Sequence, residues 1–130
     1  MSAALILALA LAQTQAAAAT PDWQSLGTHE RIETFFDPAS VQPAGARRVR
    51  VRIRGIIAAP GADGIKTATG LLEIDCAQGT ATAIEVRGTD AEGALVLNAL
   101  VPPIDRRPEP IRPASPNAAV RDAVCASAGG

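Results

Sequence analysis

Five arginines crowd the eight residues from 47 to 54, and they are the side chains best suited to bind a ligand. Four of them alternate with apolar residues: Arg48, Arg50, Arg52 and Arg54. On a β-strand such alternate residues share one face. Guanidinium groups donate hydrogen bonds in a planar fork that suits carboxylate, phosphate and sulfate, so the spacing indicates a strip that binds a polyanion. The other interpretation, common for charge runs, pairs the arginines with acids on neighbouring strands: Glu33, Glu73 and Glu85.

The sequence contains only two cysteines, Cys76 and Cys125. A zinc site needs about four ligands, and a redox pair normally has the spacing Cys-x-x-Cys, so neither chemistry fits. In an oxidising compartment the pair predicts a structural disulfide. A disulfide between them closes a loop of about 50 residues, which stabilises a fold by roughly 4 kcal/mol in the chain-entropy model.

The sequence shows no recognisable catalytic constellation. His29 is the only histidine, and the nearby Ser25 and Glu30 form no known nucleophile motif with it. Trp23 is best interpreted as a packing anchor, since one large aromatic side chain dominates a small core. We therefore predict no catalytic residues, no metal site and no cofactor, and a protein that is not an enzyme.

The composition of the first nineteen residues indicates the cellular compartment of the protein. They are mostly apolar and uncharged, and they end in the alanines 16–19. The apolar stretch 3–12 is too short to span a bilayer, and small residues follow it, as signal peptidase requires. We expect residues 1–19 to be a signal peptide and residues 20–130 to form a single domain that is periplasmic or secreted. A buried N-terminal helix is the alternative. No cysteine lies near the junction, so no lipid anchor is evident.

Composition narrows the classes of partner. The formal net charge of −1 argues against a nucleic-acid-binding protein, which would show a basic excess. Beyond the leader we expect no segment that spans a membrane. The sequence contains only three aromatic residues, so a core of Val, Ile and Leu is expected, and a thin core of this kind usually needs a covalent crosslink. Composition does not indicate an oligomeric state.

Hydrophobic periodicity and turn residues predict an α+β fold. The expected strands cover residues 23–36, 48–54, 65–76, 80–87 and 94–101. Short turns between them, including one at 42–45, favour an antiparallel meander of about five or six strands. The proline-rich segment 102–113 is expected to be an extended connection. Ser115 and Pro116 are typical of a helix start, so a helix is predicted from Pro116 to about Cys125, followed by a frayed tail.

Several short motifs occur in a recognisable order. They are Trp23, F-F-D-P-A-S-V at 35–41, I-D-C at 74–76, E-G at 92–93, I-R-P-A-S at 111–115 and Val124-Cys125. This pattern resembles the surface-adhesin protein E family of bacterial secreted and outer-membrane proteins. The resemblance implies an antiparallel sheet whose C-terminal helix is tethered by a Cys76–Cys125 disulfide.

The resemblance also implies a function. It suggests a non-enzymatic, secreted or envelope protein that contacts extracellular or envelope macromolecules through a sheet surface. The alternative is a structural or accessory periplasmic protein without adhesin activity.

Overall fold

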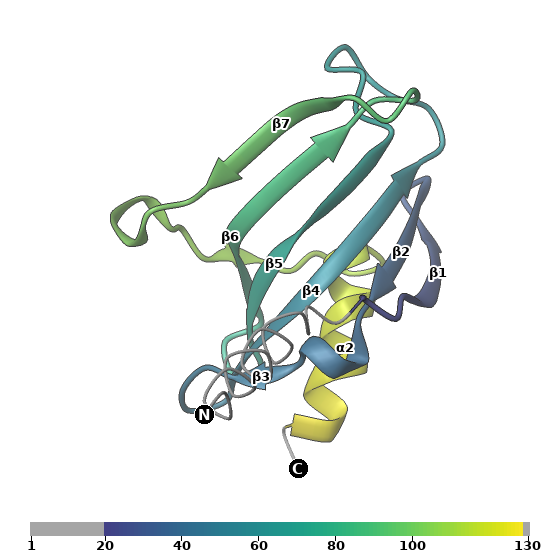
Figure 1. The fold of residues 1–130 in the computed structure, drawn as a ribbon. Helices are drawn as coiled ribbons and strands as arrows, with labels where there is room; N and C mark the ends of the chain where they lie inside the picture. Colours follow the sequence, from purple (N-terminus) through teal and green to yellow (C-terminus); the bar gives the residue numbers. More distant parts are fainter. Residues whose placement is uncertain (1–19, 129–130) are drawn as a thin grey trace, which may run out of the picture.

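The computed structural model describes residues 20–128, which form one antiparallel sheet and a C-terminal helix (Figure 1). The six strands of the main path lie in the order β1-β2-β4-β5-β6-β7. Their bounds are Gln24–His29, Ile32–Phe36, Arg48–Ile57, Thr67–Asp75, Thr80–Thr89 and Leu95–Leu100. Two short strands, β3 (Gln42–Pro43) and β8 (Glu109–Pro110), pair with β4 and β6. Two 3-10 turns, η2 (Pro38–Ser40) and η3 (Pro103–Asp105), lie in the connections, and the helix is α2 (Pro116–Ala128). The α+β prediction is confirmed.

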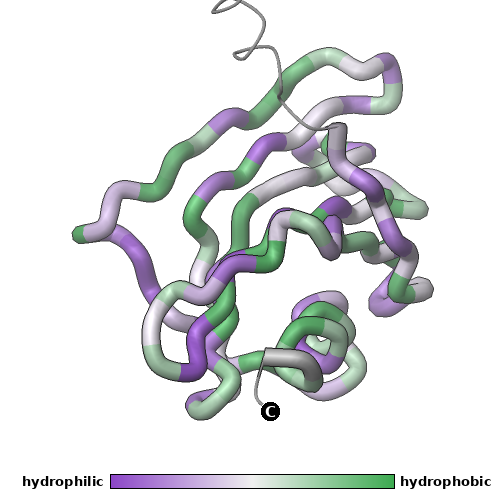
Figure 2. The backbone as a smooth tube through the Cα atoms, turned by 60° about the horizontal axis from the view of Figure 1, so that its bottom comes forward, coloured by the Kyte–Doolittle hydropathy of each residue, from purple (hydrophilic) through white to green (hydrophobic). Residues whose placement is uncertain are grey.

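The core lies between α2 and one face of the sheet, which we call the helix face. In the β4–β5 register Val49 is opposite Ile74 and Val51 is opposite Leu72, so these four side chains share that face. They are buried together with Val120 and Val124 of the helix. Figure 2 shows the helix nearly end-on beneath the curled sheet. The opposite face carries the arginines of β4, and we call it the arginine face.

The helix begins as its sequence predicts. Ser115 accepts a hydrogen bond from the backbone N–H of Ala118 (3.2 Å) and donates one to the carbonyl of Arg112 (2.6 Å). Pro116 occupies the first helical position, where no backbone donor is needed. The helix continues to Ala128, so the prediction of a frayed tail from residue 126 is wrong for residues 126–128. Residues 129–130, like the predicted signal peptide 1–19, lie outside the described residues.

Residues 23–36 form a hairpin instead of the single strand predicted from the sequence. The strands β1 and β2 are joined by Glu30 and Arg31, whose φ angles of 53° and 65° are those of a tight left-handed turn. Neither residue is the glycine or asparagine that normally marks such a turn. The turn predicted at 42–45 is also shifted, because Gln42 and Pro43 pair with β4 and the chain reverses at 44–47.

A β-bulge changes the side-chain alternation of β6. Leu72 is opposite Ala83 and Leu71 is opposite Glu85, so Ile84 has no partner on β5. The sequence alternation places Thr82 and Val86 on one face, but the register puts Thr82 on the arginine face and Val86 on the helix face. The proline-rich segment is an extended connection that includes η3 and the two-residue edge strand β8.

One glycine of β5 lies too close to β6 to carry a side chain without a shift of the backbone. A Cβ atom at Gly70 would overlap the carbonyl oxygen of Glu85, which belongs to the backbone of β6. We expect Gly70→Ala to lower the free energy of unfolding by about 1–3 kcal/mol, because the two strands must separate. Urea denaturation measures the loss. Gly61→Ala is the control, because its Cβ would meet nothing within 4 Å; equal midpoints for the two variants would contradict this reading.

Candidate functional site

The arginine strip exists, and three of its four arginines face acids on β5 and β6. The guanidinium of Arg50 donates to Glu73 across 3.0 Å, and that of Arg52 donates to Glu85 across 3.0 Å. Arg48 lies 3.5 Å from the carboxylate of Asp75. The structure therefore pairs the arginines with Glu73 and Glu85, as the second interpretation expects. The third partner is Asp75, and Glu33 lies opposite Ile56 instead.

These ion pairs are open to solvent and leave donor capacity unused. The side chains of the three arginines are between 38% and 53% exposed, so each pair contributes little to stability. A guanidinium carries five N–H donors, and one carboxylate contact uses only part of that set. Positive and negative side chains therefore alternate on the arginine face. The N–H groups that the carboxylates leave free can still donate hydrogen bonds to an anionic partner.

Arg54 has a different role from the other three arginines. Its guanidinium carbon lies 4.5 Å from the ring centre of Phe35 and 5.2 Å from that of Trp23. Its Nε is buried without a hydrogen-bond partner. Stacking of this kind stabilises the cation through the ring faces. Arg54 therefore holds Trp23 against the sheet through a cation–π contact. The solvent-exposed part of the strip consists of Arg48, Arg50 and Arg52.

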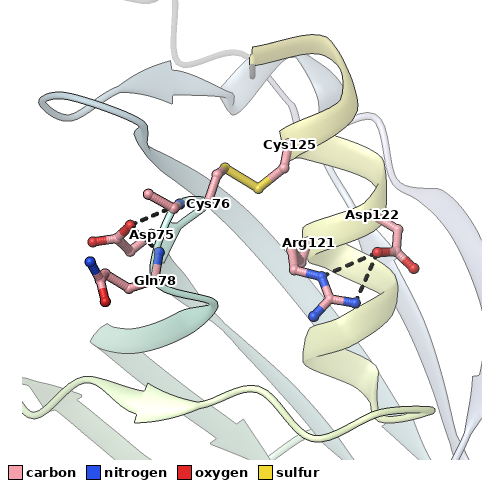
Figure 3. Close-up of a disulfide and its surroundings, with 7 residues drawn as sticks. Asp75, Cys76, Gln78, Arg121, Asp122 and Cys125 are labelled. Atoms are coloured by element: carbon pink, nitrogen blue, oxygen red, sulfur yellow. Dashed lines mark hydrogen bonds and ion pairs between the residues drawn. A yellow bond between two sulfur atoms is a disulfide. The ribbon is translucent and has the colours of Figure 1, made fainter. Parts of the chain in front are cut away.

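The disulfide fixes the helix against one end of the sheet (Figure 3). Cys76 follows β5, Cys125 lies in α2, and their Cα atoms are 5.7 Å apart. Asp75 accepts hydrogen bonds from the backbone N–H groups of Ala77 (3.0 Å) and Gln78 (2.9 Å), which shapes the turn into β6. The predicted pairing is confirmed. A structural disulfide is typical of periplasmic and extracellular proteins.

A groove lies on the helix face, beside the first turn of α2. Its volume is about 630 Å³, and its walls include Leu72 and Ala81 of the sheet and Ile111 of the segment leading to α2. At its rim Arg112 forms two hydrogen bonds with Glu30, at 2.6 and 3.1 Å. These contacts raise the pKa of Arg112, through the hydrogen bond first and the opposite charge second. The residues that line the groove lie far apart in sequence, so sequence patterns did not indicate it.

The remaining candidate residues make separate contacts: Ser25 accepts a hydrogen bond from the N–H of Gly27, and Glu30 pairs with Arg112. His29 contacts the carbonyl of Leu26 at 3.0 Å within the first hairpin. Within residues 20–128 no three His, Cys, Asp or Glu side chains are grouped as a metal site would require. No helix in this part of the chain has the length and hydropathy needed to cross a bilayer.

Strand β7 is the surface feature that sequence reasoning missed. It forms one edge of the sheet, and three of its apolar side chains are at least 47% exposed: Leu95, Val96 and Leu100. A signal was present in the sequence, because Leu95, Val96 and Leu97 are consecutive apolar residues without the alternation of a half-buried strand. This pattern predicts a strand, but it does not indicate that both faces of the strand are exposed to solvent.

Comparisons with known proteins support the fold. No family model matches the sequence, and no curated protein matches it either. Among solved structures the chain is similar to Haemophilus influenzae protein E in crystal form II, with a TM-score of 0.53 and 12% sequence identity. The match covers 86% of this chain and 100% of the other. The resemblance to protein E is therefore supported at the level of the fold.

Proposed function

We propose that the chain is a non-enzymatic binding protein of the cell envelope or its exterior, which holds an anionic macromolecule on the arginine face. One observation carries this proposal. The helix and the segment leading to it both lie on the helix face, so within residues 20–128 no helix covers the arginine face. In Figure 1 strand β4 passes in front of α2, so the side of β4 that faces away from the helix is turned toward the viewer.

The charge pattern of the arginine face supports recognition of carboxylate, phosphate or sulfate groups. Arg48, Arg50 and Arg52 project from alternate positions of one strand, about 7 Å apart. A polyanion with several acidic groups can contact them in succession through donors that the present carboxylate contacts leave free. The disulfide is compatible with a site outside the cytoplasm.

A second candidate is a structural or accessory periplasmic protein without such a ligand. The ion pairs with Asp75, Glu73 and Glu85 favour it, because they already satisfy part of the hydrogen-bonding capacity of the arginines. The two functions differ in what happens when the arginines or their acid partners are changed.

Retention on immobilised heparin, eluted with salt, distinguishes these functions. We expect the variant Arg48→Ser/Arg50→Ser/Arg52→Ser to bind at least ~10-fold more weakly than wild type, because charge-assisted hydrogen bonds are lost. Removing the acids with Glu73→Gln/Glu85→Gln should instead strengthen retention, since Arg50 and Arg52 become free. Salt should weaken binding of every form by screening.

Matched controls separate a local strip from net charge. Arg31→Ser/Arg107→Ser/Arg121→Ser removes the same charge from positions outside the arginine strip, and Glu92→Gln/Asp105→Asn matches the acid variant. If each control variant changes the salt concentration of elution as much as the variant it matches, retention depends only on net charge. The arginine face is then not a binding site. Wild-type protein that is not retained at low salt would favour the structural or accessory function.

A further inference from the structure

We infer that the protein forms a two-fold symmetric dimer in which β7 pairs antiparallel with β7 of a second copy, joining two sheets into one. The inference goes beyond the proposed binding function and does not depend on it. It concerns an edge of the sheet, whereas the proposed ligand surface is one of its faces.

The first observation is the chemistry of the β7 edge. An edge strand presents unpaired backbone N–H and C=O groups, and natural proteins normally protect such edges with charges, prolines or covering segments. Strand β7 has the sequence L-V-L-N-A-L, which contains neither charge nor proline. Leu100 is 71% exposed and Leu95 is 54% exposed. This edge therefore lacks both charge and proline protection while exposing apolar side chains.

The opposite edge of the same sheet provides a comparison. Strand β1 has the sequence Q-S-L-G-T-H, and its pairing with β2 is irregular between Ser25 and Thr28. Gly27 lies there with a φ of 89°. A polar, irregular edge resists pairing with another strand. The difference between the two edges indicates that β7 is the one built for a partner.

A second copy is the partner that fits this strand best. In a two-fold pairing each side chain meets a residue of the same strand, so a charged strand would repel itself and an uncharged one does not. The stretch from Gly93 to Ile104 contains no charged residue. A different protein recognised through complementary charge would need a charged strand here. An uncharged apolar edge suits self-pairing.

The pairing of β7 with β6 also limits the register of such a dimer. Leu97 is opposite Gly88 and Ala99 is opposite Val86, which places both on the helix face, whereas Asn98 is opposite Arg87 on the arginine face. Residues opposite one another in an antiparallel pair share a face. A two-fold axis through Asn98 satisfies this condition, because Leu97 then meets Ala99 of the second copy. The axis brings the two Asn98 side chains together.

Light scattering coupled to size exclusion tests the dimer over a concentration series, with the disulfide intact. We expect twice the mass of one chain at high concentration. Leu100→Lys should raise the dissociation constant at least ~10-fold, because it places a cation in the edge-to-edge contact. Ile104→Lys is the control, because Ile104 is 81% exposed but lies outside β7. A single-chain mass at every concentration, or a dimer that Leu100→Lys leaves unchanged, would overturn the inference.

Crosslinking tests the register. The native cysteines are paired with each other, so Asn98→Cys introduces one new thiol. Directly opposed strand residues have Cα atoms about 4.5–5.5 Å apart, within the range of a disulfide. We expect mild oxidation to link Asn98→Cys into a covalent dimer far faster than Gly61→Cys, an exposed loop control. Equal crosslinking rates for the two cysteine variants would exclude a two-fold axis at Asn98.

A wild-type protein that is monomeric and binds lipid vesicles would overturn the dimer and assign the β7 edge to a lipid surface.

Discussion

Replacing Cys76 and Cys125 by serine is expected to lower the free energy of unfolding by roughly 4 kcal/mol. The crosslink joins residues 49 positions apart, so its loss releases a long loop in the unfolded chain. It also frees a helix whose buried residues Val120 and Val124 cover the sheet. Small domains have a total free energy of unfolding of about 5–15 kcal/mol, so the crosslink supplies a large share of it. Guanidinium denaturation of both proteins measures the difference.

Reduction provides the control for this double substitution. Wild-type protein treated with a thiol reductant should denature at the midpoint of the serine variant, whereas the serine variant should not respond to reductant. An unchanged midpoint for the reduced wild type would show that the crosslink contributes nothing to stability. Titration of denatured, unreduced protein with a thiol reagent should detect no reactive sulfur, since both cysteines are bonded to each other.

Ile74→Ala is expected to lower the free energy of unfolding by about 2–5 kcal/mol. Ile74 is fully buried, with Val49 on one side and Ala81 on the other in the strand register. The small side chain of Ala81 cannot fill the space that a shortened Ile74 would leave. Because the core contains few large residues, the cavity removes a substantial part of its contacts. Urea denaturation followed by circular dichroism measures the loss.

Ile104→Ala is the matched control for the core substitution. It makes the same chemical change at a side chain that is 81% exposed, where little apolar area is lost from contact. We expect a change within about 0.5 kcal/mol in dilute solution. Similar losses at the two positions would mean that Ile74 does not lie at the centre of the core.

The central part of the fold could be predicted because its local signals agree with its burial. The alternation around Val49 and Val51 marked β4, and Ser115 with Pro116 marked the start of the helix. The first hairpin could not be predicted, because Glu30 and Arg31 adopt left-handed angles that are uncommon for residues other than glycine and asparagine. The bulge at Ile84 also escaped prediction, since it depends on pairing between two strands.

The candidate site was only half accessible to sequence reasoning. The arginines could be assigned to one face from their period of two, but their partners depend on register. Pairing of β4 with β5 placed Asp75 opposite Arg48, whereas no local pattern ranks Asp75 above Glu33. Arg54 looked equivalent to its neighbours until the fold brought Trp23 and Phe35 beside it.

The order of elements along the chain has a consequence for how the molecule reaches this state. The helix packs against β1, β2 and β4, which come from the opposite end of the described chain. Phe36, Val49 and Val51 therefore stay uncovered until residues near 120 arrive. Contacts between residues so far apart in sequence slow folding, because the entropy of closing the loop is lost before the contacts form. Before the helix packs, these apolar side chains of the early strands are exposed to water and to neighbouring chains.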